Sequence, residues 1–350
     1  MKRLLLSFAF VLFATAVFGQ VADRDVLVTP GGTVFTVASQ IPPADADNPV
    51  DALQTLTLTV QNGSEVKHIL VPASTSSGSH FGAALAYDSE SSTLFVLWIH
   101  MPNAMSSELL LAPYRDGKWQ SAVSVDSEPY RFRNNLRLGI TRTVPQLQND
   151  GFTYVDVPAL LLHAVWWEES GKGEEARYAL MTIDKGALQL PIETHSLEEF
   201  VASTDTVNNT VDPKFNKELL RHPAIVSSPM QSSVEVVFGD THANLIHGVT
   251  LRPIADSRIH IPVGVGSGGP GGGPRPKSLA APPNFNADWK GPITIIERGD
   301  RLVFANANET ALSYITYTNG IWTDVKSIAI DSHFPAEAAL AAIDKMLSTQ

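Results

Sequence analysis

The sequence of 350 residues contains no cysteine, so it can form neither a disulfide framework nor the lipid-modified cysteine of a lipoprotein. Small secreted domains without a sufficient core usually depend on disulfides. A chain of this length can instead bury a sizeable core, and its hydrophobic content of 44% is typical of a globular protein. We therefore expect the core alone to hold the fold together.

Charged residues are also scarce, at 17% of the chain, and their balance is acidic, with a net charge of -11. No block of Lys and Arg residues is present to neutralise the phosphates of a nucleic acid. We therefore expect no nucleic-acid partner.

A long apolar run occurs only at the N-terminus, where the pattern is that of an export signal. Two basic residues precede Leu4–Phe18, which is apolar but too short to span a membrane comfortably. The residues at the -3 and -1 positions suit a cleavage before Gln20, so residues 1–19 are expected to be a signal peptide. A cut after Ala22 is the weaker alternative.

No later stretch is long and apolar enough for a second membrane span. The export signal and the absence of cysteine together predict a secreted or periplasmic bacterial protein, with no membrane span after removal of the signal. Its candidate partners are a glycan or a protein of the cell envelope.

The middle of the chain, Pro158–Ile192, reads as three consecutive β-strands. Ala159–Trp167 is an apolar, β-prone run, and a polar loop, Glu168–Glu175, separates it from a second strand at Arg177–Ile183. Asp184-Lys185-Gly186 then predicts a tight turn into a third strand. Comparable groups of four strands recur roughly every 60–75 residues. The second strand of each group contains, in order, Val34, Phe95, Leu161, Val236 and Val303.

Five such units, each with a tight third-to-fourth hairpin, predict an all-β fold: a β-propeller of five four-stranded blades with a short C-terminal helix. The propeller would occupy residues 20–334 and the helix residues 335–350. Residues 265–283 are rich in Gly and Pro and are expected to form a flexible insertion. The alternative is a β-sandwich, or two small β domains joined at Val265–Pro283.

Two of the predicted hairpins carry a fuller motif. Tyr114-Arg115-Asp116-Gly117-Lys118-Trp119 and Tyr317-Thr318-Asn319-Gly320-Ile321-Trp322 resemble degenerate Asp-boxes, the blade signature of sialidase-like (BNR) propellers. At a coarser level, five-bladed glycosidases and sugar-binding lectins are similar. The resemblance implies the propeller fold, but no arginine triad or Tyr/Glu nucleophile pair of that family can be matched, so it does not imply sialidase activity.

In a propeller, the loops between blades and the loops between second and third strands share one face, which we call the long-loop face. Variable loops on a rigid scaffold commonly carry the functional residues. The predicted strand ends place seven ligand-binding candidates on this face: His80, His100, Glu168, Glu169, His222, Asp240 and His242.

These residue types suit two kinds of chemistry. His80 and His222 head equivalent first strands and could ligate a metal, orient a sugar hydroxyl, or simply cap the strand ends. Glu168, Glu169 and Asp240 could supply a carboxylate pair for glycoside hydrolysis, or form an ordinary charged surface. No HxH, HExxH, P-loop or Gly-x-Ser-x-Gly spacing is present, so neither a metal nor a cofactor is predicted and no catalytic residue is assigned.

The sequence therefore favours an exported β-propeller that binds a carbohydrate or a protein, without established catalysis. A secreted glycoside hydrolase using carboxylates on the long-loop face is the first alternative. A structural protein of the cell envelope is the second. Two buried carboxyl groups about 5–9 Å apart would favour hydrolysis.

Overall fold

The computed structural model describes residues 24–40, 54–74, 78–103, 105–148, 153–184, 186–190, 192–197, 224–227, 234–240, 245–251, 277–280, 293–298, 301–318 and 321–348. Within these ranges the chain is almost entirely β, with one long helix, α3, at Ala336–Ser348. No helix of the described part is long and apolar enough to cross a membrane. The predicted signal peptide lies outside these ranges.

The described strands pair into five antiparallel sheets, numbered in chain order. The first sheet contains β1 (Arg24–Val28), β2 (Val34–Gln40), β3 (Thr55–Asn62) and β4 (Glu65–Leu70). The second contains β5 (Ser79–Asp88), β6 (Thr93–Asn103), β7 (Ser106–Arg115), β8 (Lys118–Trp119) and β9 (Val123–Asp126). The third contains β10 (Arg131–Leu147), β11 (Tyr154–Ser170), β12 (Gly173–Asp184), β13 (Ala187–Leu188) and β14 (Glu193–Ser196).

The last two sheets repeat this plan. The fourth contains β15 (Ala224–Ser227), β16 (Val234–Asp240), β17 (Leu245–Leu251) and β18 (Lys277–Ala280). The fifth contains β19 (Ile293–Arg298), β20 (Arg301–Ala307), β21 (Ala311–Thr318), β22 (Ile321–Trp322) and β23 (Lys326–Ala329). β18 falls within residues 265–283, which were predicted to be a flexible insertion, but Lys277–Ala280 forms a strand that pairs with β17. The rest of 265–283 lies outside the described residues.

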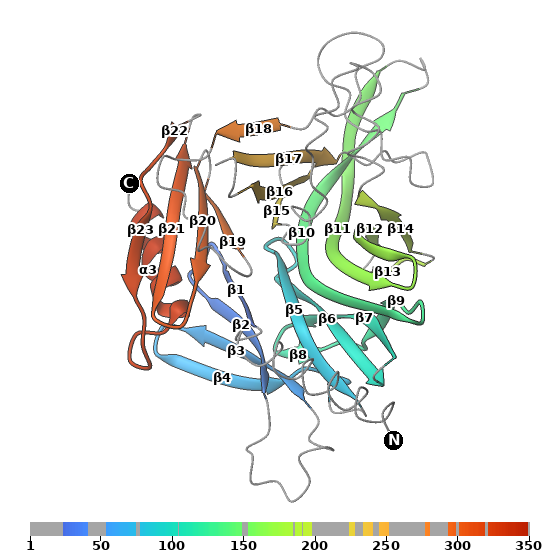
Figure 1. The fold of residues 1–350 in the computed structure, drawn as a ribbon, viewed down its shortest axis with the longest axis horizontal. Helices are drawn as coiled ribbons and strands as arrows, with labels where there is room; N and C mark the ends of the chain where they lie inside the picture. The colour runs from blue at the N-terminus through green and yellow to red at the C-terminus, as the bar shows by residue number, and fades with distance from the viewer. Residues whose placement is uncertain are drawn as a thin grey trace, which may run out of the picture.

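The sheets are arranged as a propeller-like ring around a centre (Figure 1). The first four strands of each sheet follow one another in sequence order, and the first strand lies innermost. The additional strands β9, β14 and β23 pair with the third strand of their sheets. β1 contacts β5, β5 contacts β10, β10 contacts β15, β15 contacts β19, and β19 returns to β1. This arrangement confirms the predicted all-β, propeller-like architecture, because the sheets of a β-sandwich would pack face to face in two layers without such a circuit.

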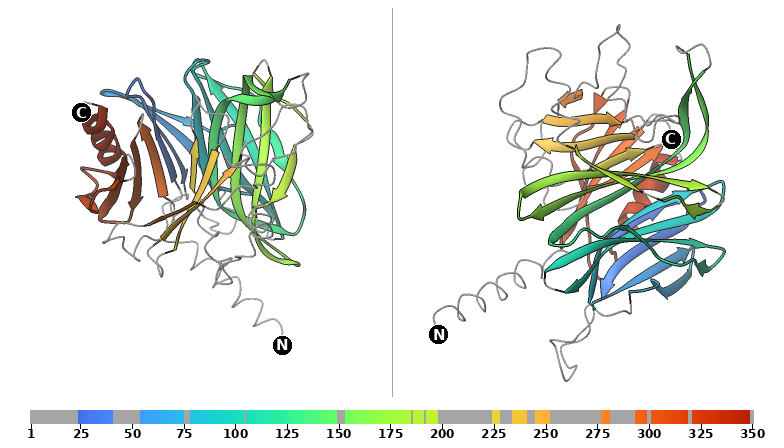
Figure 2. Two further views of the ribbon diagram at one scale, coloured as in Figure 1. Left: turned by 90° about the horizontal axis from the view of Figure 1, so that it is seen from above. Right: turned by 90° about the vertical axis from the view of Figure 1, so that its right-hand side faces the viewer.

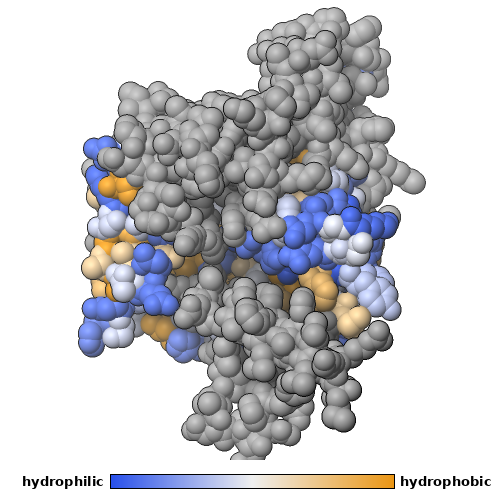
Figure 3. Space-filling view, viewed as in Figure 1, coloured by the Kyte–Doolittle hydropathy of each residue, from blue (hydrophilic) through white to orange (hydrophobic). Residues whose placement is uncertain are grey.

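Apolar side chains fill the spaces between neighbouring sheets. Because side chains alternate along a strand, Val96 and Trp98 of β6 pack against the first sheet, whereas Leu97 and Ile99 pack against the third. Trp166 of β11 packs against the second sheet in the same way, and its side chain is fully buried. Hydrophilic residues gather instead on the surface over β12–β14, at the right of Figure 3.

The predicted C-terminal helix is present and lies where the ring closes. Pro335 precedes the first turn of α3, a position where its missing N–H is not needed. Ala339, Leu340 and Ile343 form the buried face of α3 and share one apolar cluster with Val34 of β2 and with β20 and β21 of the fifth sheet. The helix thus covers the junction between the fifth and first sheets (Figures 1 and 2).

The tight third-to-fourth hairpin predicted for every unit forms in four of the five described sheets. In the fourth sheet the prediction is wrong, because residues 252–276 separate β17 from β18. Asp116 and Gly117 both have positive φ, 51° and 76°, between β7 and β8. Trp119, which follows this turn, packs its ring on Tyr114 with centroids 5.0 Å apart and lies against the core between the first and second sheets. The Trp of this degenerate Asp-box therefore covers apolar side chains at the outer edge of its sheet.

The third sheet departs from its predicted boundaries. β10 and β11 are each 17 residues long, and their shared hairpin projects beyond the other strands (Figure 2). The predicted polar loop Glu168–Glu175 is wrong: β11 continues to Ser170 and β12 begins at Gly173, so only two residues make the turn. Of the glutamates in these two strand ends, Glu168 and Glu175 are paired with arginines.

Candidate functional site

The long-loop face is the edge where second strands end and third strands begin. His80 of β5 pairs directly with His100 of β6 at this edge of the second sheet. In the third sheet, Glu168 of β11 pairs with Arg133 of β10 and with Glu175 of β12. The predicted residues His80, His100 and Glu168 therefore lie on the predicted face, but in two separate clusters.

The histidine cluster comprises His80, His100, Trp98 and Glu108. His80 is fully buried, and its ring stacks on that of His100 with centroids 4.3 Å apart and an angle of 5° between the planes. Trp98 Nε1 donates a hydrogen bond to His80 Nδ1 at 3.2 Å, so a neutral His80 carries its proton on Nε2. His100 Nδ1 lies 2.7 Å from Glu108 Oε1. Both histidines thus have partners within the protein, and no group of residues in the described ranges could hold a metal ion.

Gly78 lies beside His100 of the histidine cluster and has no room for a side chain. Its φ is +106°, and a Cβ atom would lie 2.5 Å from the Met101 carbonyl oxygen and 2.9 Å from His100 Nε2. We expect Gly78→Ala to lower the free energy of unfolding by about 2–3 kcal/mol, from backbone strain and displacement of the β6 end.

The matched control for this change is Gly63→Ala. Gly63 also has positive φ, +58°, but no atom lies within 4 Å of its Cβ position. This control should cost only about 1 kcal/mol in urea unfolding. Equal losses for the two variants would show that the close contacts around Gly78 do not matter.

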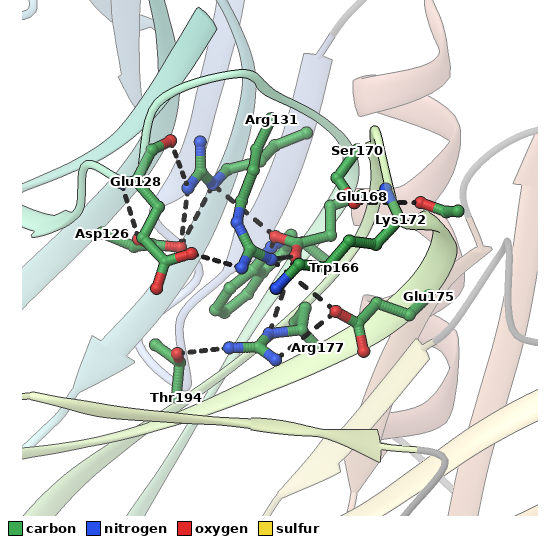
Figure 4. Close-up of polar contacts among 12 residues, drawn as sticks. Asp126, Glu128, Arg131, Trp166, Glu168, Ser170, Lys172, Glu175, Arg177 and Thr194 are labelled. Atoms are coloured by element: carbon green, nitrogen blue, oxygen red, sulfur yellow. Dashed lines mark hydrogen bonds and ion pairs between the residues drawn. The ribbon is translucent and has the colours of Figure 1, made fainter.

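The second cluster surrounds Glu168, which is 1% exposed, and we call it the arginine cluster (Figure 4). Arg131 Nη1 bonds Glu168 Oε1, and Arg177 Nε lies 3.8 Å from the same oxygen. Trp166 Nε1 donates to Glu168 Oε2 at 3.0 Å, and Arg133 Nε lies 4.0 Å from it. Both carboxylate oxygens are therefore occupied by donors from the protein.

Three further carboxylates complete the arginine cluster. Asp126 Oδ2 of β9 accepts a hydrogen bond from Arg133 Nη2 at 2.8 Å and so joins the second sheet to the third. Glu128 pairs with Arg131, and Glu175 Oε1 lies 3.5 Å from Arg177 Nη1. Three arginines face four carboxylates, including Glu168, so the cluster is nearly neutral, with one excess negative charge.

The two clusters occupy equivalent places in their sheets. Trp98 stands two residues before His100, and Trp166 stands two residues before Glu168. His100 pairs with His80 and Glu108 on its two neighbouring strands. Glu168 pairs with Arg133 and Glu175 at the corresponding positions. In each cluster a polar residue two positions after a buried tryptophan contacts both neighbouring strands of its own sheet, and the arginine cluster also joins its sheet to the preceding one through Arg133 and Asp126.

Of the remaining predicted residues, only Glu169 has a described side chain. Glu169 is exposed, and strand alternation directs its side chain to the side of β11 opposite Glu168. Asp240 ends β16, and only its backbone is described. His222 and His242 lie outside the described residues. Among the described side chains, no other predicted carboxylate contacts Glu168.

One further carboxyl group ties two innermost strands together. Asp25 of β1 accepts hydrogen bonds from the backbone N–H groups of Leu85, at 2.8 Å, and Val26, at 2.9 Å. Burial raises the pKa of Asp25, while the charge of Arg137 and these two bonds act in the opposite direction. Because Leu85 belongs to β5, Asp25 links the centre of the first sheet to that of the second.

Sequence reasoning missed the arginines of the cluster and the two aromatic residues beside them. Tyr130-Arg131-Phe132-Arg133 alternates aromatic and basic residues at the entry to a first strand. Arg131 and Arg133 point into the sheet junction, whereas Tyr130 and Phe132 are 66% and 40% exposed. This alternation is the signal that could have identified the segment.

Comparisons with known proteins assign no family. No protein-family model matches the chain, and no curated protein sequence matches it. Among solved structures, a protein of unknown function from Dyadobacter fermentans is 9% identical with a TM-score of 0.46, covering 89% of this chain and 83% of its own. The GH93 alpha-L-arabinofuranosidase of Fusarium graminearum, in complex with arabinobiose, is 12% identical with a TM-score of 0.45, over 89% and 77%. A thermostable family-43 glycoside hydrolase is 10% identical with a TM-score of 0.40, over 89% and 94%. These values are too low to assign this chain an activity.

Proposed function

We propose that this chain is an exported, five-bladed β-propeller that acts as a carbohydrate- or protein-binding module without established catalysis. The circuit of contacts through β1, β5, β10, β15 and β19 supports five blades. The hairpin from Tyr114 to Trp119 supports a place among sialidase-like propellers. Export rests on the signal pattern of residues 1–19.

The state of Glu168 is the observation that carries the proposal. A glycosidase needs two carboxyl groups that a substrate can reach, one of them able to donate a proton. Glu168 is buried, and both of its oxygens are bonded to arginine or tryptophan donors. Asp88, another buried carboxylate, accepts a hydrogen bond from Arg142 Nε at 2.6 Å. Both groups stabilise the junctions between sheets, so a rigid scaffold for binding is the function that this geometry favours.

A glycan array combined with a reducing-sugar assay tests the proposal on the secreted chain. We expect binding to at least one glycan, with no release of reducing sugar from the glycans that bind. Hydrolysis of a bound glycan would overturn the proposal in favour of the glycoside hydrolase. Complete silence on the array would favour a structural role in the cell envelope.

A further inference from the structure

Two aromatic side chains at the junction of the second and third sheets are open to solvent. Tyr130 is 66% exposed and Phe132 is 40% exposed, on either side of Arg131 in the chain. Both lie where β9 leads into β10, on the long-loop face. Tyr130 ends the loop and Phe132 is the second residue of β10. Exposed aromatic rings grouped in one short segment are typical of ligand-binding surfaces.

The backbone that carries these rings is held rigidly. The Ser107 hydroxyl donates to the Arg131 carbonyl at 2.9 Å and accepts from the Arg133 N–H at 3.1 Å. The Arg131 guanidinium is fixed in turn by Glu128 and Glu168. A ligand that binds to the loop therefore finds it already ordered, which lowers the entropic cost of binding.

Tyr130 also adopts a backbone conformation that is unfavourable for its side chain. Its φ is +59°, in the left-handed region that bulky residues rarely occupy. Such strain persists where the surrounding structure imposes it, and it is concentrated at functional sites. In this case the strained conformation presents an aromatic ring to solvent rather than to the core.

The charge beneath the loop indicates which class of ligand suits it. Every arginine of the cluster is paired with a carboxylate, and the cluster carries one excess negative charge. An acidic polysaccharide would find no free guanidinium in the cluster and would be repelled weakly. Aromatic rings instead offer apolar faces to the C–H surfaces of an uncharged sugar, and the Tyr hydroxyl offers a hydrogen bond.

We propose that Tyr130 and Phe132 form a binding site for a neutral saccharide chain. This inference rests on the proposed binding function and assigns it a place and a ligand class. The arginine cluster helps to hold the backbone that carries the two rings, and it does not contact the sugar.

Isothermal titration calorimetry of the full mature chain tests the site with xylohexaose, cellohexaose, mannohexaose and arabinohexaose, with hexagalacturonate as the acidic counterpart. We expect at least one neutral hexasaccharide to bind, and Tyr130→Ala/Phe132→Ala to weaken its association constant at least tenfold. The matched control is Phe334→Ala, which removes a ring of similar exposure, 39%, just before α3. This control should leave the association constant within twofold of the original.

Each other outcome has a distinct meaning. If the double variant shows no thermal unfolding transition, it is not folded, and the single variant Phe132→Ala is measured in its place. Phe132→Ala leaves Tyr130 unchanged and should still weaken binding. Undiminished affinity in both variants would overturn the site while leaving the binding function intact. Tighter binding of hexagalacturonate than of every neutral sugar would overturn the ligand class. Failure of the original protein to bind any of the sugars would overturn the site and count against the carbohydrate-binding function as well.

Discussion

Glu168→Gln is expected to lower the free energy of unfolding by about 3–5 kcal/mol, the cost of removing one partner from a buried ion pair. Glutamine keeps one oxygen that can accept from Trp166, but its NH2 group would face the Arg131 donor, so the change removes the charge and one acceptor. Arg131, Arg133 and Arg177 would then face each other with one carboxylate fewer. Urea unfolding followed by circular dichroism measures the loss directly.

Glu169→Gln is the matched control for this change, because it alters the adjacent residue on the opposite, exposed side of the same strand. It should change the free energy of unfolding by no more than about 0.5 kcal/mol. At a temperature where Glu168→Gln remains folded, this variant should lose less affinity for a glycan ligand than Tyr130→Ala/Phe132→Ala does, because Glu168 holds Arg131 in place but does not contact the sugar. A stable Glu168→Gln variant with lost function would show that the carboxylate serves a substrate and not the fold.

The fold was largely predictable because its signals are local. Turns such as Asp116-Gly117 need positive φ at adjacent positions, and few residue pairs other than Asp/Asn-Gly provide it. Between such turns, apolar and polar side chains alternate where one face of the strand is buried, and the strand is uniformly apolar where both faces are buried. The C-terminal helix was also predictable from a local signal, because its apolar residues recur at helical spacing in the sequence itself.

The candidate site was predictable only in its location. His80, His100 and Glu168 were placed on the correct edge because strand ends follow from turn positions. Their partners were not, because Arg131 and Glu168 are 37 residues apart and meet only when two strands pair. The run of glutamates from Glu168 to Glu175 looked like a solvated loop for the same reason. Whether a charged residue is exposed or buried depends on whether residues of opposite charge lie beside it in the fold, and the sequence alone does not show which residues these are.

The second large effect is expected on acidification, and it originates in a buried hydrogen-bond chain across the third sheet. His163 of β11 is fully buried, with Nε2 2.9 Å from Thr141 Oγ1 and Nδ1 2.8 Å from the Tyr178 hydroxyl. Burial lowers the pKa of His163 to about 3, well below its ordinary value of 6.5. The imidazole is therefore neutral in the folded protein throughout the physiological range.

The sign of the pH dependence follows from this depressed pKa. Above pH 6.5 the histidine is neutral in both the folded and the unfolded chain, so its titration does not change the free energy of unfolding there. Between pH 6.5 and about 3 the unfolded chain binds one more proton than the folded chain, so stability falls as the pH falls. The slope is about 1.4 kcal/mol per pH unit, and the loss reaches about 4 kcal/mol near pH 3.

His163→Gln isolates this contribution, because glutamine can bond to both hydroxyl groups but does not titrate in this range. We expect urea unfolding at pH 7, 6 and 5 to show a slope smaller by about 1 kcal/mol per pH unit in this variant than in the original protein. The comparison uses slopes because glutamine changes the packing and hence the absolute stability. His333→Gln, at an exposed histidine before α3, should leave the slope unchanged. An unaltered slope in His163→Gln would mean that His163 binds its proton before unfolding, through an opening of the third sheet that admits water to the chain of Thr141, His163 and Tyr178.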